Sequence, residues 1–300
     1  MTNGSPWRGI GAMVVSIATF LACDTFMKLA MADVPPLEVL VFRGLFATCL
    51  CVPLILALGL ARQIRLALNG WVLLRALSEA MAVICFVIVL ARIPIGDLTA
   101  IMQTTPLIIV LGAALLWREP IGPLRMGLIG LGFAGALMVA QPGAGAASLV
   151  ALLGFPAALF AAGRDLLSRK VPANVPALVA VLTTLAMVMV CAFIANAVFG
   201  SWVAPAPQRL AQMAGAGLFL VSGQLFVFLA YRLAPAAIVA PFSYTAALWG
   251  VLSGAAVFGD VPNALGLAGM ALIVASGVAV VVLGGRRWRV AAVSAAAEVN

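Results

Sequence analysis

The sequence predicts an all-α membrane protein whose ten transmembrane helices form two inverted five-helix repeats. Three observations predict this fold class: the composition is strongly apolar, the apolar residues fall into ten long runs, and the two halves of the chain match each other. Of the 300 residues, 65% are hydrophobic and only 9% are charged, and the mean hydropathy is +1.21. A water-soluble domain carries about 25% charged residues. Lipid must therefore be the solvent for most of this chain.

Ten predominantly apolar runs are long enough to cross a bilayer, for which about 20 residues are needed. They span residues 9–31, 36–59, 70–91, 95–117, 122–141, 147–169, 175–199, 211–232, 236–258 and 262–283. The connections between them are short and carry Pro, Gly or Asn, which favour turns. None is long enough to hold a soluble domain. The first run is too long for the apolar part of a signal peptide, so we expect a membrane helix there.

Lysine and arginine are unevenly distributed between the two sides of the membrane that these runs define. With the N-terminus in the cytoplasm, the cytoplasmic segments hold Arg8, Arg62, Arg65, Arg118, Arg125, Arg169, Lys170, Arg232, Arg286, Arg287 and Arg289. The opposite segments hold only Arg92 and Arg209. Short connections follow the positive-inside rule, so we expect a bacterial inner membrane protein with both termini cytoplasmic. Topology thus explains the net charge of +8, and we expect the lipid bilayer, not a nucleic acid, as partner.

An internal duplication appears when the sequence is shifted against itself by about 141 residues. In that register Asp24 meets Asp165, Pro94 meets Pro235, and Thr104 meets Thr245. We therefore expect a first five-helix repeat at 1–143, a second, inverted five-helix repeat at 144–285, and a basic, disordered cytoplasmic tail at 286–300. Because five is an odd number of spans, the second repeat must enter from the opposite face of the membrane. Inverted repeats of this kind are typical of secondary transporters.

A family resemblance rests on the fourth and fifth runs. Residues 100–119 read AIMQTTPLIIVLGAALLWRE, with a proline inside the helix and an acidic residue at its end, and a glycine-striped helix follows. Phe42-Arg43-Gly44 and Arg75 fit the same pattern. The chain resembles the ten-helix EamA-type members of the drug/metabolite transporter (DMT) superfamily, including its amino-acid exporters. The resemblance implies transport of a small metabolite such as an amino acid, S-adenosylmethionine or a drug-like compound.

Ionisable residues within the runs form a first group of candidate site residues, because each is costly in lipid unless it is paired or faces water. The candidate gating or coupling charges are Asp24, Arg43, Arg75, Glu79, Arg164 and Asp165. Asp24 with Lys28, Arg75 with Glu79, and Asp165 with Arg169 are spaced to share one helix face. Two interpretations stay open: ion pairs or a protonatable carboxylate that serve gating and proton coupling, or salt bridges that are purely architectural.

Polar residues near the membrane midplane form the second group. The candidate substrate-binding residues are Gln103, Thr104, Thr105, Ser222, Gln224, Ser243, Tyr244 and Thr245, and the candidate helix breaks are Pro106, Pro156 and Pro241. Broken helices beside polar side chains are the usual setting of a solute site in transporters. The alternative is that the hydroxyls bond to their own helix and that the prolines only kink it. We expect the first, third, fourth, sixth, eighth and ninth helices to line the cavity.

Glycines at helical spacing in the fifth and tenth runs predict close helix packing, either between the two halves or between two copies of the chain. The chain contains no histidine and no catalytic motif, so we expect neither an enzyme nor catalytic residues, and no metal site or cofactor. The sequence favours a secondary transporter that exports an amino acid, aromatic ones included, by alternating access. Transport of another metabolite, and a channel or membrane scaffold, are the alternatives. Proton coupling, and a monomer or a homodimer, stay open.

Overall fold

A computed structural model describes residues 6–117, 122–141, 146–234 and 236–297, and every element within these ranges is helical. The elements are α1 (Pro6–Ala30), α2 (Pro36–Ala57), η1 (Ala61–Leu68), α3 (Gly70–Leu90), α4 (Ile95–Met102), α5 (Thr105–Trp117), α6 (Pro123–Ala140), α7 (Ala146–Leu152), α8 (Gly154–Ser168), α9 (Ala177–Phe199), α10 (Pro207–Leu233), α11 (Ala236–Val239), η2 (Ala240–Tyr244), α12 (Thr245–Ser253), the π-helical turn η3 (Gly254–Phe258) and α13 (Ala264–Ala297).

The predicted membrane fold is confirmed. Seven helices in the described ranges are long and apolar enough to cross a bilayer, and three shorter apolar helices span Met126–Ala140, Phe242–Phe258 and Ala264–Val280. Together they correspond to the ten apolar runs of the sequence. Large apolar side chains such as Leu115 and Phe199 are 74% and 87% exposed, which is the surface that lipid covers in a membrane protein.

Three of the spans are interrupted. The fourth divides into α4 and α5 at Gln103 and Thr104, the sixth into α7 and α8 at Leu153, and the ninth into α11, η2 and α12. The first two interruptions lie within three residues on the N-terminal side of Pro106 and Pro156, and Pro241 lies within η2 of the third. Proline has no N–H to donate and its ring clashes with the preceding turn, which explains why the helix is reset at these points.

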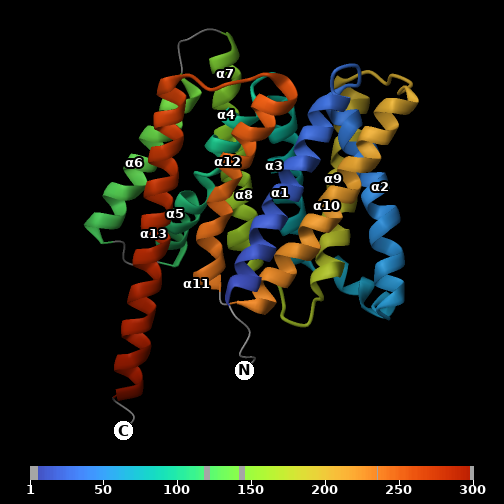
Figure 1. Cartoon of the computed structure of the whole chain (residues 1–300). Coiled ribbons are helices and arrows are strands. Elements are labelled where there is room, and N and C mark those ends of the chain that lie inside the picture. Colours follow the sequence, from blue (N-terminus) through green and yellow to red (C-terminus); the bar gives the residue numbers. More distant parts are fainter. Residues whose placement is uncertain (1–5, 118–121, 142–145, 235, 298–300) are drawn as a thin grey trace.

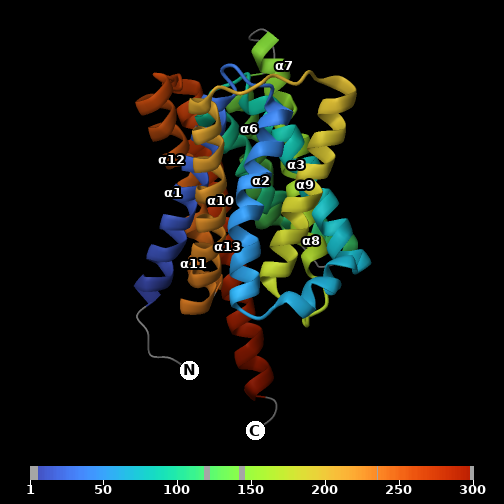
Figure 2. The same ribbon diagram turned by 90° about the vertical axis from the view of Figure 1, so that its right-hand side faces the viewer.

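The most extensive helix pairs are symmetric between the two halves: each has a counterpart between the corresponding spans of the other half, or joins two corresponding spans. α1 packs along α10 as α3 packs along α8, and α2 packs on α9, α4 on α12, and α6 on α13 (Figure 1). Turning the molecule by 90° brings α2, α9 and α10 to the viewer as one layer (Figure 2). This pairing is what the sequence duplication leads one to expect. The division of the chain into repeats at residues 143 and 144 stays a prediction.

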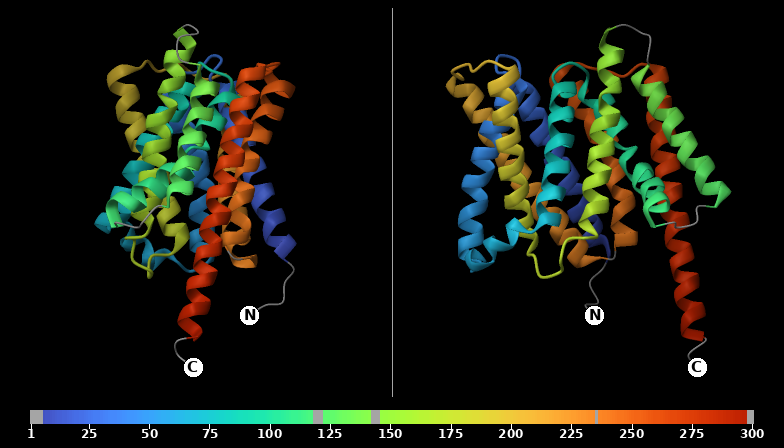
Figure 3. Two further views of the ribbon diagram at one scale, coloured as in Figure 1. Left: turned by 90° about the vertical axis from the view of Figure 1, so that its left-hand side faces the viewer. Right: turned by 180° about the vertical axis from the view of Figure 1, so that it is seen from behind.

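The pair α6 and α13 lies at one edge of the molecule, away from α2 and α9 (Figure 3). The two helices pack closely at Gly135 and Gly269, where a Cβ on either glycine would lie within 2.7 Å of the other's carbonyl oxygen. Only residues without side chains permit such a distance between helix backbones. Of the two alternatives left open for the glycine stripe, this geometry supports packing between the halves.

Both termini lie at the same end of the bundle, called here the terminal end, and the opposite end is called the distal end (Figure 1). α13 extends beyond the other helices at the terminal end and continues to Ala297. The structure thus describes residues 286–297 as helix, and the assignment of residues 286–300 to a separate cytoplasmic tail stays a prediction. The segment VAAVSAAA is rich in alanine, the strongest helix former, so the last span simply continues as a helix.

Candidate functional site

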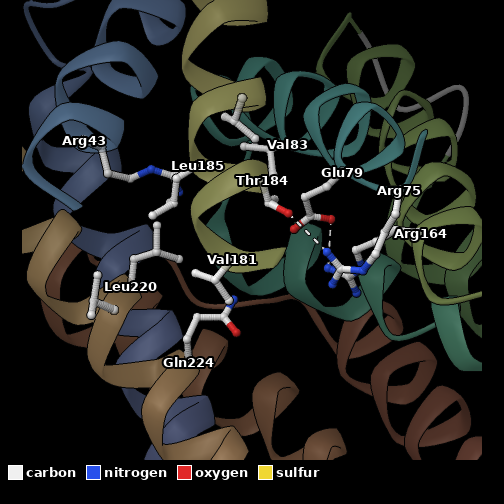
Figure 4. A pocket seen from close by; sticks show the side chains of 12 residues that line it. Arg43, Arg75, Glu79, Val83, Arg164, Val181, Thr184, Leu185, Leu220 and Gln224 are labelled. Atoms are coloured by element: carbon white, nitrogen blue, oxygen red, sulfur yellow. Dashed lines mark hydrogen bonds and ion pairs between the residues drawn. The ribbon is translucent and has the colours of Figure 1, made fainter. Parts of the chain in front are cut away.

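A central cavity of about 90 Å³ lies inside the helix bundle. Its lining residues are Arg43, Arg75, Glu79, Val83, Arg164, Val181, Thr184, Leu185, Val188, Leu220, Val221 and Gln224. They come from α2, α3, α8, α9 and α10, and Figure 4 shows Arg43 on one wall with Arg75, Glu79 and Arg164 together on the other. Three arginines and one glutamate therefore face a small space that is otherwise mostly aliphatic.

Arg164 is neutralised by two carboxylates. Its Nη1 donates to Glu79 Oε2 on α3 at 2.8 Å, and its Nε donates to Asp165 Oδ1 at 2.8 Å. The side chains of Arg164 and Glu79 are only 27% and 17% exposed, so both charges lie in a poorly solvated place. Charge-assisted hydrogen bonds of this length are strong, and they join α3 to α8.

Arg75 lies next to this ion-pair network and bonds to two hydroxyls. Its Nε donates to Ser168 Oγ at 2.8 Å, and its Nη1 donates to Thr184 Oγ1 at 3.1 Å. Ser168 in turn donates to the carbonyl of Arg164 at 2.8 Å. The i,i+4 pairing of Arg75 with Glu79, which the spacing allowed, is replaced by tertiary bonds to α8 and α9.

Arg43 is the most buried of the three arginines, with 5% of its surface exposed. Its Nη1 lies 4.0 Å from Cys23 Sγ on α1, and Asp24 interacts with it electrostatically. The Nε of Arg43 is buried and has no hydrogen-bond partner among the residues that the structure describes. α2 comes close to α10 here, because Gly217 packs directly against the carbonyl of Arg43.

A second group of polar residues closes the distal end of the bundle. Lys28 Nζ lies 3.8 Å from Asp260 Oδ2 and donates to the carbonyl of Ile93 at 2.6 Å. Thr25 and Ser253 share a hydrogen bond of 2.5 Å between α1 and α12. Gly259, which ends η3, adopts a left-handed conformation with φ of +71° and turns the chain just before Asp260. Beside them, a Cβ on Gly250 of α12 would lie 3.0 Å from Thr99 of α4.

The predicted midplane residues divide between two places. Gln224 lines the central cavity, whereas Gln103 donates from the α4–α5 interruption to the carbonyl of Ser243 in η2 at 3.2 Å. Thr104 donates to the carbonyl of Ile101 and Thr245 to the carbonyl of Phe242, in each case three residues earlier in the chain. Thr105, Ser222 and Tyr244 lie outside the cavity lining, and the Tyr244 ring packs on Gly277 of α13.

Of the helices expected to line a cavity, α3, α8 and α10 do so, and α2 and α9 contribute in addition. The sequence prediction omitted Thr184 and Ser168, which hold Arg75, and Thr25 and Ser253, which join the distal ends of α1 and α12. A single hydroxyl in an apolar run gives little signal, because it usually bonds to its own helix. Asp260 is an acidic residue at the end of the ninth apolar run, and its contact with Lys28 depends on tertiary folding.

Comparison with known proteins finds a family match in the first half of the chain and relatives along most of its length. Residues 7–141 match the EamA-like transporter family. The chain is 29% identical over 274 residues to a protein named riboflavin transporter from Rhizobium johnstonii, a match that covers 91% of this chain and 89% of that protein. It is 28% identical over 275 residues to a protein named pseudopaline exporter CntI from Pseudomonas aeruginosa, covering 90% and 95% of the two chains.

A solved crystal structure with 19% sequence identity superposes with a TM-score of 0.66, covering 92% of this chain and 99% of that one. At this identity the likeness shows the fold alone. The family match and the named relatives are the findings that bear on function. Residues 7–141 carry an EamA-like transporter domain, and along most of its length the chain is similar to proteins named as small-molecule transporters.

Proposed function

We propose that the protein exports a small polar metabolite, with an amino acid as the first candidate, by alternating access across a bacterial inner membrane. The observation that carries this proposal is the composition of the central cavity. α2 and α3 come from the predicted first repeat, and α8, α9 and α10 come from the second. A cavity whose walls belong to different halves opens and closes when one half rocks against the other.

The size of the cavity fits a transporter in a closed conformation. Its volume of about 90 Å³ is well below the roughly 300–1,000 Å³ of pockets that hold drug-sized ligands. A metabolite can enter only after the walls separate. The ion pair of Glu79 with Arg164 and the bonds of Arg75 to α8 and α9 then become contacts that change during the cycle.

The distal closure supplies the gate that an export cycle needs. Lys28 with Asp260, and Thr25 with Ser253, hold α1 against the end of the ninth span, and Gly250 allows α12 to pack on α4. With both termini in the cytoplasm, as the positive-inside pattern predicts, this end faces the periplasm. Release of the substrate to the outside requires these contacts to break.

The charges in the cavity favour an amino acid over an uncharged solute. A zwitterion presents one negative and one positive group, and the walls present guanidinium groups together with the Glu79 carboxylate. The relatives named for riboflavin and pseudopaline make another metabolite the second candidate. Glu79 and Asp165 are the carboxylates that a proton-coupled mechanism would use at this site.

Flux into proteoliposomes tests the proposal. Purified protein would be reconstituted and offered labelled phenylalanine, threonine, S-adenosylmethionine or riboflavin, with and without a pH gradient, against protein-free vesicles. We expect saturable uptake of at least one amino acid, and a response to the gradient would assign proton coupling. Uptake that never saturates, accompanied by ion conductance, would instead indicate a channel. No movement of any of these solutes by correctly folded protein would reject the amino-acid proposal.

A further inference from the structure

We infer that the transported solute carries a carboxylate and that Arg43 is the residue that binds it. The inference rests on the proposed function of the central cavity and names the class of solute that it accepts. It depends on the hydrogen-bond partners of the three arginines in the cavity wall. All three carry the same charge, but their partners differ.

Two of the arginines already have the partners that a buried guanidinium requires. Arg164 bonds to two carboxylates at 2.8 Å, and Arg75 bonds to two hydroxyls. A guanidinium whose N–H groups already have acceptors gains little binding free energy from a further ligand. Both residues are therefore best understood as groups that shape the cavity and hold α3, α8 and α9 together.

Arg43 is in a different state. It is 5% exposed, its Nε lacks a hydrogen-bond partner in the described part of the chain, and the contact of its Nη1 is a thiol at 4.0 Å, a weak acceptor. Asp24 interacts with it electrostatically, but no oxygen of Asp24 lies within the 4.0 Å of a salt bridge among the described ion pairs. A buried charged donor left unpaired is costly, so Arg43 calls for an acceptor that the described residues do not supply.

The position of Arg43 makes the solute the natural source of that acceptor. Arg43 lines the cavity on the wall opposite Arg75 and Arg164, and Figure 4 shows the aliphatic side chains of Val181 and Leu185 between the two walls. A carboxylate next to aliphatic side chains is poorly hydrated, and there the two parallel N–H groups of a guanidinium bind it most strongly. Gln224, on the same cavity, offers an amide to the polar remainder of the solute.

The inference separates solutes by one functional group. An amino acid or another organic acid should be preferred over its own carboxamide, which has the same shape but no negative charge. Arg43→Gln should remove this preference while leaving the rest of the cavity in place. Arg43→Lys should keep part of it, because lysine retains the charge but not the planar pair of donors.

The test compares phenylalanine with phenylalaninamide on the full-length protein in proteoliposomes. The variants are Arg43→Gln and Arg43→Lys, and the matched control is Arg92→Gln, an exposed arginine in the connection between α3 and α4. For wild type and the control we expect half-saturation by phenylalanine at a concentration about 10-fold or more below that for the amide, since one charge-assisted bond is replaced by a weaker one. Arg43→Gln should bring the two values together, with Arg43→Lys intermediate.

Binding measured without transport keeps the inference distinct from the proposed function. Thermal unfolding of the detergent-purified proteins would be followed with millimolar phenylalanine or phenylalaninamide, and this also shows whether each variant is folded. Stabilisation by the acid alone, lost in Arg43→Gln, supports the inference even if flux fails. Equal selectivity in wild type and Arg43→Gln, or saturable flux of uncharged riboflavin alone, would overturn it and leave a transporter of another solute class. If Arg43→Gln does not fold, an unchanged preference in Arg43→Lys overturns it.

Discussion

Charged side chains inside the bundle are held by neighbours on other helices more than by neighbours on their own. Glu79 lies four residues after Arg75, yet it forms its ion pair with Arg164 on α8. In the same way, Lys28 lies four residues after Asp24, yet it forms its ion pair with Asp260, at the end of the ninth span. Bonds between helices neutralise the charges and also fix how the helices pack. For Glu79 and Arg164 the two roles meet at the wall of the cavity.

Replacing Glu79 by Gln should weaken the link between α3 and α8. Arg164 would keep Asp165 but lose a bond of 2.8 Å, and its charge would be only half compensated in a poorly solvated place. We expect a loss of about 1–3 kcal/mol, at the lower end because both groups are partly exposed. Unfolding of the purified protein, measured for Glu79→Gln, Arg164→Gln and the double variant, gives the coupling energy. Additive effects of the two single changes would show that the pair does not stabilise the fold.

Transport by Glu79→Gln then separates an architectural carboxylate from a coupling carboxylate. A transport rate and a pH response equal to those of wild type would remove Glu79 from the mechanism and leave it a structural role. A rate that no longer responds to the pH gradient would assign it to coupling.

The sequence identified these charged residues but not their partners. Their rarity in apolar runs made Asp24, Arg43, Arg75, Glu79, Arg164 and Asp165 visible as candidates. Spacing along one helix could suggest only local pairs, and the bond from Arg164 to Glu79 crosses 85 positions of the chain. Because the second repeat is inverted, Asp165 is expected toward the cytoplasmic side, as Glu79 is, with Arg164 close by, and Arg164 bonds to both carboxylates.

Among the helical elements, interruptions and glycines decide how closely the spans approach one another. The interruptions next to Pro106 and Pro241 place Gln103 beside the carbonyl of Ser243, where the fourth and ninth spans meet. Glycines also let α6 and α13 approach each other closely. Between α1 and α10, the hydroxyl of Ser16 donates to the carbonyl of Gly223 at 2.8 Å. Close backbone contact of this kind replaces the hydrophobic effect as the force that joins helices in lipid.

Gly269→Ala should separate α6 from α13, because its Cβ would lie 2.6 Å from the carbonyl oxygen of Gly135. Backbone atoms cannot move aside as a flexible side chain can, so we expect a destabilisation of about 1–3 kcal/mol. Gly130→Ala is the matched control, since a Cβ at that position meets no atom within 4 Å. It should be neutral or stabilising, because alanine has the higher helix propensity. The measurement is the melting temperature of each variant in detergent. Equal values for Gly269→Ala and Gly130→Ala would contradict the close packing of α6 on α13.

At this scale the sequence predicted most of the architecture. The ten runs correspond to helices, and prolines located the interruptions, because composition and missing N–H groups act locally. Which glycine meets which could not be predicted, since Gly127 and Gly130 share the stripe with Gly135 but face open space. The sequence analysis ended the tenth span at residue 283, whereas α13 continues to Ala297 through an alanine-rich segment that favours helix.

For the whole molecule, one group of contacts closes the distal end, and a second group forms part of the wall of the cavity. The described contacts at the distal end join α1 and α4 to the ninth span, while those of Arg75 and Arg164 join α3, α8 and α9. The sequence predicted a cavity between the halves and three of its five lining helices. It could not place α2 and α9 there, because their cavity-facing residues other than Arg43 are Val, Leu and Thr, which any membrane helix carries.

Accessibility of the cavity from each side of the membrane, with the distal end locked, tests the central claim most directly. In a variant without the five native cysteines, Val181→Cys would report on the cavity, and Thr25→Cys with Ser253→Cys would form the lock. The two hydroxyl oxygens lie 2.5 Å apart, close to the roughly 2.0 Å of a disulfide bond.

Labelling of residue 181 by a membrane-impermeant maleimide would be measured by peptide mass in cells and in inverted vesicles. The oxidised control carries Thr25→Cys without Ser253→Cys. Alternating access through this cavity predicts labelling from both sides in the control, and from the cytoplasmic side alone once the lock has formed, with flux restored on reduction. Labelling from the periplasmic side that persists in the fully locked protein would contradict the account.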